Sequence, residues 1–334
     1  MPQKAKAAKT YGYMKPCGNV QDRARFYPPS SLQDRSANKT YFEYFLKYDL
    51  KQNITTRLEI ENWSTSDDLV LHGLDIRQSD DNPEEIELFA VNHARQGERI
   101  ATFLHTLGSS TLRFVKQYSH DLIVTPNGVA AAGPRSFFIT NDHYFYNGTG
   151  RAFEEEFGPF TWASSVVYCE EKMGGLDCHI VSPNDAHPNA NGISSADGGR
   201  NLIINDVDYG TSTVYAVDPR TKALVHEQTI IEALGGTPDN VFQIPSTGDL
   251  VVALIPNLTA VAARFEGGLL SEGPSVESTV LRLVKANNYT PQILYWDDGG
   301  VLSFVTSAVV DTKLKRMVMG GVYERHWAVC NIDI

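Results

Sequence analysis

Two stretches of the chain decide the fold, because they repeat one pattern of polar and apolar residues. Residues 127–142 read NGVAAAGPRSFFITND, and residues 191–206 read NGISSADGGRNLIIND. Each stretch begins with Asn-Gly, continues through a short apolar run typical of a strand, and reaches an Asn-Asp pair fourteen residues after its first Asn. The repeat predicts radially arranged β-blades whose polar inner ends lie close to a shared axis.

Similar polar marks recur at a regular period along the chain. The steps between them are 55, 64 and 49 residues, and the marks are His72-Gly73, Asn127-Gly128, Asn191-Gly192 and Asp239-Asn240. Periods near ~50 residues with about four short strands each are typical of propeller blades, and 334 residues allow about six of them. We therefore predict an all-β, six-bladed propeller with four-stranded blades. A β-sandwich or two barrels would not repeat the same mark before the same strand.

The expected organisation is one propeller domain over residues 31–334, preceded by an N-terminal arm or an incomplete first strand over residues 1–30. Few helices are expected, at Ala152–Phe157 with a cap at Thr149, and at Leu258–Phe265. The aromatic group Phe153, Phe157, Phe160 and Trp162 forms either a lid or part of the core, and its composition favours the core.

The charge balance and the absence of long apolar runs exclude some classes of protein. A net charge of −11 argues against a nucleic-acid partner, because phosphate binding needs clustered Lys and Arg. The sequence contains no run of about 18 apolar residues, so it predicts no membrane span. The first residues lack the apolar stretch of a signal peptide. Six Asn-x-Ser/Thr sequons nevertheless indicate the secretory pathway, at Asn38, Asn53, Asn62, Asn147, Asn257 and Asn288.

The four cysteines fit no zinc-binding spacing. Cys169 and Cys178 flank a hairpin-like turn and are placed to bridge neighbouring strands. Cys17 and Cys330 lie near the two termini, where a bond would close a ring. Buried free thiols are the alternative for both pairs.

Four of the repeated polar residues make a candidate metal site. The oxygens of Asn127, Asn191, Asp239 and Asn240 are hard ligands that suit calcium. Each dipeptide alone is a common turn. Their recurrence at the blade period favours convergence on one ion.

Two histidines are candidates for acid–base chemistry. His72 and His93 are 21 residues apart, at the start and end of one predicted hairpin. Two imidazoles in contact can share a proton, so that one tunes the other as a general base. The alternative is a structural pair of histidines. His120 and His143 are further candidates for supporting roles.

With these residues in place, the chain resembles the paraoxonase/arylesterase family of calcium-dependent lactonases over about residues 43–334. The most specific part is NGVAAAGPRSFFITNDHYF, residues 127–145. Supporting motifs follow in the family's order, at residues 164–168, 189–193, 238–240, 247–250 and 327–330.

The resemblance implies a six-bladed propeller with a catalytic and a structural calcium ion on its axis. It assigns Asn127, Asn191, Asp239 and Asn240 to the catalytic ion, and His72 and His93 to a dyad that activates water. It places His120 in a supporting position around these residues. The implied substrate is a small ester or lactone whose carbonyl oxygen contacts the catalytic ion.

The chain departs from the family pattern near its start and at Gly128. The family has a Glu-Asp pair on its first strand, whereas the first Glu here is Glu43 and residues 1–17 hold no match. Gly128 stands where the family has an Asp that binds the structural ion. We therefore expect one catalytic calcium ion, held with fewer charges, and no structural second ion.

Three functions compete on this sequence. The first is calcium-dependent hydrolysis of lactones or aryl esters. The second is different chemistry on the same scaffold, such as a cyclase or isomerase of a biosynthetic pathway, since propellers host unrelated reactions. The third is a binding propeller without catalysis and with a degraded calcium site. The sequence makes no prediction about the oligomeric state.

Overall fold

The computed structural model describes residues 11–14, 20–34, 38–231, 235–266, 275–324 and 326–334. Strands dominate these residues, which confirms the all-β prediction. The helices among them are α1 (Val20–Arg23), α2 (Gly148–Phe157) and α3 (Leu258–Glu266), with 3-10 turns at η2 (Pro28–Ser30) and η3 (Lys285–Asn287). Across the described ranges no helix is both long and apolar enough to cross a membrane.

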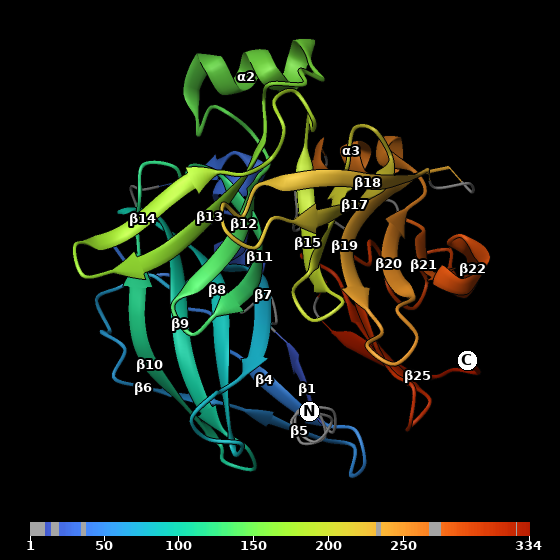
Figure 1. Ribbon diagram of the computed structural model, residues 1–334, viewed down its shortest axis with the longest axis horizontal. Helices are drawn as coiled ribbons and strands as arrows, with labels where there is room; N and C mark the ends of the chain where they lie inside the picture. The colour runs from blue at the N-terminus through green and yellow to red at the C-terminus, as the bar shows by residue number, and fades with distance from the viewer. Residues whose placement is uncertain (1–10, 15–19, 35–37, 232–234, 267–274, 325) are drawn as a thin grey trace.

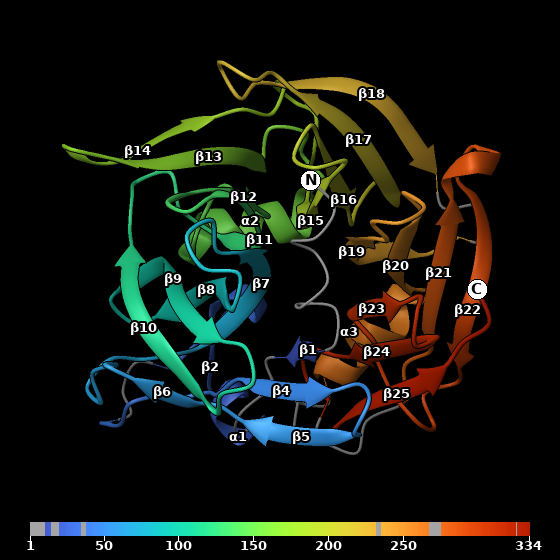
Figure 2. The same cartoon turned by 60° about the horizontal axis from the view of Figure 1, so that its bottom comes forward.

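Five sheets follow one another around the molecule as blades (Figure 2). The first blade contains β6 (Glu59–Glu61), β7 (Leu71–Gln78), β8 (Glu85–Ala94), β9 (Gly97–Thr106) and β10 (Thr111–Tyr118). The second contains β11 (Pro126–Gly133), β12 (Ser136–Asn141), β13 (Ser165–Lys172) and β14 (Gly175–Ile180). The third contains β15 (Ala190–Ala196), β16 (Asn201–Asp206), β17 (Thr211–Val217) and β18 (Leu224–Ile231).

The last two blades complete this series. The fourth contains β19 (Thr237–Gln243), β20 (Leu250–Ile255), β21 (Ser278–Val284) and β22 (Thr290–Asp297). The fifth contains β23 (Ser307–Asp311), β24 (Arg316–Gly320) and β25 (Trp327–Asn331). Within the blades neighbouring strands are antiparallel, except that β6 pairs in parallel with β10. The propeller is therefore confirmed.

The predicted number of six four-stranded blades is wrong, because the described residues form five blades of five, four, four, four and three strands. The remaining place in the ring holds a three-stranded sheet made of β1 (Tyr11–Met14), β4 (Leu46–Asp49) and β5 (Ile54–Arg57). This sheet has three strands among the described residues, and the next segment, β6, joins the edge of the first blade. A short hairpin, β2 (Phe26–Tyr27) and β3 (Leu32–Gln33), forms a separate two-stranded sheet, and its Phe26 and Tyr27 pack against ring residues such as Val70 and Ile255.

The hydrophobic core lies between neighbouring sheets rather than at the axis. Phe138 and Val166 of the second blade pack against Leu202 and Ile204 of the third, for example. Tyr48 of β4 packs with Val318 of β24, and Phe45 packs into the first blade. These contacts close the ring, because each sheet buries apolar side chains against both neighbours.

Helix α2 stands above one face of the ring, beside the ends of the second blade (Figure 1). It begins at Gly148 with Asn147 as its N-cap, four residues earlier than predicted and without the expected cap at Thr149. The sequence favoured a place in the core for the aromatic group around this helix, but the group lies at the surface. Phe153, Phe157 and Trp162 are 47%, 61% and 44% exposed. Phe160 stacks with Phe153 and Trp162, and Phe157 contacts Phe153, so that the four rings form one aromatic surface.

Cys169 and Cys178 form a disulfide across β13 and β14. Cys330 is a free thiol, and the other half of the second suggested pair, Cys17, lies outside the described residues. The structure therefore settles one of the two pairs left open by the sequence.

Candidate active site

The repeated polar residues lie next to one another around the axis, because the inner strands approach very closely at the glycines that follow them. A methyl group added at Gly73 would lie 2.4 Å from the Asn127 carbonyl oxygen. One added at Gly192 would lie 2.3 Å from the Asp239 carbonyl oxygen. The spacing leaves no room for a side chain at these glycines, so successive blades bring their polar residues together in chain order.

Gly128 completes this series between the second and third blades. A methyl group there would lie 2.9 Å from the Asn191 carbonyl oxygen and 2.8 Å from Cγ2 of Ile193. His72, Asn127, Asn191 and Asp239 therefore follow one another around the axis, each one blade from the next. Asn240 follows Asp239 directly.

The amide nitrogens of Asn127 and Asn240 donate hydrogen bonds within the protein, which leaves their amide oxygens available to another ligand. Nδ2 of Asn127 donates to Oδ2 of Asp142 at 3.2 Å. Nδ2 of Asn240 donates to Oδ1 of Asp239 at 2.7 Å and to the Thr306 carbonyl at 2.8 Å. Oδ1 of Asn191 is buried and has no hydrogen-bond partner among the described residues. A buried carbonyl oxygen without a donor is costly unless something else binds it.

The oxygen atoms of these residues are the type of ligand that a hard cation prefers. The described ranges hold no cluster of three or more His, Cys, Asp or Glu side chains able to bind a metal. A cation at the axis would therefore rely on amide oxygens and on the carboxylate of Asp239, and the unpartnered Asn191 oxygen suits such a ligand.

The two histidines lie in contact beside this set of oxygens. The ring centroids of His72 and His93 are 5.2 Å apart. His93 is 1% exposed, and its Nδ1 bonds the carboxylate of Glu98, which is also buried. Its Nε2 is buried without a hydrogen-bond partner in the described part of the chain. Glu98 thus orients one imidazole nitrogen and leaves the other with a lone pair to use.

Helix α2 positions a second histidine–carboxylate pair beside Asn127. Nδ1 of His143 lies 2.9 Å from Oδ1 of Asp142. Burial opposes ionisation of Asp142, but His143, Arg151 and the Asn127 amide outweigh it and lower the pKa of Asp142 to about 2. The carboxylate is therefore charged near the axial oxygens at neutral pH.

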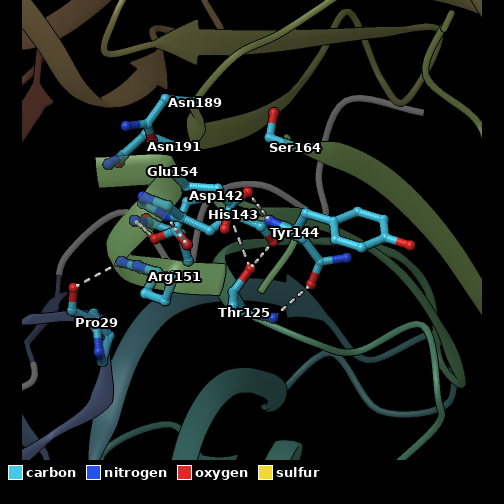
Figure 3. A network of polar contacts seen from close by, with 12 residues as sticks. Pro29, Thr125, Asp142, His143, Tyr144, Arg151, Glu154, Ser164, Asn189 and Asn191 are labelled. Atoms are coloured by element: carbon cyan, nitrogen blue, oxygen red, sulfur yellow. Dashed lines mark hydrogen bonds and ion pairs between the residues drawn. The ribbon is translucent and has the colours of Figure 1, made fainter. Parts of the chain in front are cut away.

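Hydrogen bonds hold the loop that carries Asp142 and His143 in place (Figure 3). Thr125 donates its hydroxyl to the His143 carbonyl and accepts the His143 amide. Glu154 of α2 accepts the backbone amides of Tyr144 and Phe145, both at 2.9 Å. Helix α2 thus anchors the loop that carries Asp142 and His143.

A small cavity opens beside the dyad. Its lining combines His93, its partner Glu98 and the Asp142 carboxylate with residues of the N-terminal segment and α2. The lining residues are Pro28, Pro29, His93, Glu98, Thr125, Asp142, Tyr146 and Arg151.

His120 lies apart from this group. Its Nδ1 accepts the backbone amide of Leu122, and the charged group it affects is Asp177 on the outer strand β14. Among the described residues it shows no hydrogen bond to the dyad or to the four oxygen-bearing residues. The structure therefore brings together His72, His93, His143 and the four axial residues, and leaves His120 outside.

Comparison with known proteins agrees with this geometry, since an arylesterase family model matches residues 30–332. The chain belongs to the arylesterase family. The earlier resemblance to paraoxonases and arylesterases is thereby confirmed at the level of the family.

Arylesterase relatives of known name are distant in sequence. Serum paraoxonase/arylesterase 2 of Gallus gallus is 28% identical over 248 residues, which are 73% of this chain and 64% of the chicken protein. Serum paraoxonase/arylesterase 1 of Rattus norvegicus is 28% identical over 261 residues, 78% of this chain and 67% of the rat protein. The match to the chicken relative thus spans less than two thirds of that protein.

A solved gluconolactonase from Xanthomonas campestris has a similar fold, with a TM-score of 0.51 at 12% identity. The superposition covers 87% of this arylesterase-family chain and 79% of the other. At this identity the likeness concerns the propeller fold alone.

Sequence reasoning missed two parts of this site in the arylesterase-family chain. Glu98 stands five residues after His93, across a tight β-hairpin, and an Asp or Glu near a His is too common to single out. Asp142 was noticed as part of the repeated Asn-Asp mark. Its contact with Asn127 depends on the pairing of β11 with β12, and the spacing alone does not reveal it.

Proposed function

We propose that this protein is a calcium-dependent hydrolase of lactones or aryl esters. The observation that carries the proposal is the convergence of four oxygen-bearing residues around one axis, beside a histidine dyad oriented by a buried carboxylate. Membership of the arylesterase family supports the class of reaction. The names of the relatives support both kinds of substrate.

The residues that would hold the ion are Asn127, Asn191, Asp239 and Asn240. When bound there, calcium supplies a Lewis acid for the carbonyl oxygen of the substrate. We propose one ion rather than two, because the close approach at Gly128 leaves no space for the acidic side chain that a second site needs. With Asp239 as the one carboxylate of the set, the affinity for calcium is expected to be modest.

The dyad performs the proton transfers in this proposal. Glu98 holds the Nδ1–H of His93, so that the dyad accepts a proton from water through an imidazole lone pair. The resulting hydroxide attacks the carbonyl carbon, and the C–O bond to the leaving alcohol breaks. The proton then passes from the dyad to the departing oxygen. His143 with Asp142 supports the site from the side of α2.

We further propose a single propeller domain over residues 31–334 to which residues 1–30 add an incomplete first strand, β1, paired with β4, and that the protein enters the secretory pathway. The disulfide between Cys169 and Cys178 is typical of oxidising compartments. The Asn residues of all six sequons are exposed, which suits glycosylation.

The test is hydrolysis of phenyl acetate and of an aliphatic lactone by protein loaded with calcium, before and after a chelator. We expect both reactions to stop with the chelator and to resume when calcium alone is restored. Hydrolysis that the chelator leaves unchanged would contradict the calcium mechanism. Metal-free turnover of a substrate other than an ester would favour a cyclase or an isomerase.

A further inference from the structure

The N-terminal segment of the chain lies directly against the histidine dyad, although the blade repeat does not include it. Tyr27 is 2% exposed, and its ring meets both imidazoles edge-on. Its centroid lies 5.4 Å from that of His72 and 5.6 Å from that of His93. The same segment continues into Pro28 and Pro29, which line the cavity beside the dyad.

A buried ion pair links this segment to the strand that carries His72. Nε and Nη2 of Arg23 donate to Oε1 and Oε2 of Glu43 at 2.8 and 2.6 Å. Their side chains are 1% and 7% exposed. The Arg23 guanidinium also lies 4.3 Å from the centre of the Tyr27 ring. The pair is therefore bidentate, desolvated and in contact with the aromatic ring that meets the dyad.

Both peptide groups of Leu71 are held by this pair. Nη2 of Arg23 donates to the Leu71 carbonyl at 2.9 Å, and the Leu71 amide donates to Oε2 of Glu43 at 2.7 Å. Leu71 is the first residue of β7 and directly precedes His72. A change in the ion pair would therefore move the backbone from which the His72 side chain departs.

Stability alone does not explain such a pair. Removing two charges from water is expensive, and apolar residues of similar volume often stabilise a fold equally well. The geometry gives a better reason, because bidentate bonds specify both the position and the direction of the groups they join.

We propose that Arg23, Glu43 and Tyr27 are positioning residues for the His72–His93 dyad. The ion pair holds the start of β7, and the Tyr27 ring seats the two imidazoles against each other. The inference rests on the proposed function for its catalytic meaning. Its structural content concerns the two imidazoles and can be measured without a substrate.

The experiment compares Arg23→Lys and Tyr27→Leu with wild type. Lysine keeps the charge but cannot make the forked contacts to Glu43 and Leu71. The matched control is Arg282→Lys, because Nε and Nη2 of Arg282 also donate to a buried carboxylate, both to Oδ2 of Asp249 at 2.8 and 2.6 Å, in the fourth blade. Thermal unfolding followed by circular dichroism checks that each variant folds. If Arg23→Lys does not fold, Tyr27→Leu still tests the proposal.

Imidazole nitrogen NMR shifts, kcat and KM are measured on each folded variant. We expect the signals of His72 and His93 to change in both N-terminal variants and not in Arg282→Lys. We expect kcat to fall about tenfold or more with little change in KM, since misplaced catalytic groups slow the chemical step. Unchanged imidazole signals in a folded N-terminal variant, or the same change in the control, would overturn the proposal. If wild type hydrolyses no ester, the proposed function fails, while the NMR comparison still decides the positioning role.

Discussion

Glu98 is the residue whose charge the proposed chemistry needs most directly. We expect Glu98→Gln to lower kcat by about 100-fold, because the amide keeps the size of the side chain but no longer stabilises a protonated His93. Steady-state kinetics with phenyl acetate measure this change. The matched control is Glu84→Gln, an exposed carboxylate on the same blade, which should retain wild-type kcat. Equal kcat in both variants would remove Glu98 from the mechanism.

Asp75 is a single residue that makes a pH-dependent contribution to the stability of the fold. Burial raises its pKa to about 6, although the amides of Ala131 and Ile76 partly offset this. The folded protein therefore binds this proton more tightly than the unfolded chain. The stabilisation is fully present below about pH 4 and is lost as the pH rises through about 6, an effect of roughly 2–3 kcal/mol.

The variant Asp75→Asn removes this titration. Its free energy of unfolding, measured with urea, should gain about 2–3 kcal/mol relative to wild type between pH 4 and pH 7.5. A difference from wild type that is the same at both pH values would show that Asp75 does not titrate in this way.

At the scale of elements, the close approach of inner strands holds the axial residues together. We expect Gly192→Ala to destabilise the fold by about 1–3 kcal/mol, because its methyl group would meet the Asp239 carbonyl oxygen of the next blade. Gly174→Ala is the control, since a methyl group there meets no atom within 4 Å. Urea unfolding of the two variants measures the difference. Equal stability would mean that the blades tolerate a wider spacing.

The hairpin of β13 and β14 depends on its disulfide. The bond joins residues nine apart, and a loop of this size contributes about 2–3 kcal/mol by restricting the unfolded chain. We expect a reducing agent to lower the stability of wild type by this amount. The double variant Cys169→Ala/Cys178→Ala should not respond. A response of the double variant equal to that of wild type would show that the Cys169–Cys178 bond is not the source of the effect.

The elements that sequence predicted best are those that repeat. The inner strands β11 and β15 begin next to the quoted Asn-Gly marks, and α3 agrees with its prediction to within one residue. The predicted number of blades was wrong because dividing the chain length by the repeat period does not show which sheet each strand joins. The pairing of β6 with β10 is a contact between distant segments, and local pattern carries no information about it.

At the scale of the whole molecule, the predicted site residues came from different blades and still converge, because a propeller turns a sequence period into a ring. The segment around Arg23 and Tyr27 could not be found in this way. It has no place in the repeat, and its partners Glu43, Leu71 and His72 are 20 to 49 residues away in the chain. His120 shows the opposite case, since a residue suggested by resemblance lies outside the group.

The proposed function requires that the axial oxygens hold one calcium ion beside the dyad. A crystal structure of the protein grown with calcium, with the ion identified by anomalous scattering, locates this ion. We expect one ion, with oxygens of Asn127, Asn191, Asp239 and Asn240 at about 2.3–2.6 Å. An axis without an ion at saturating calcium, or an ion bound by other residues, would contradict it.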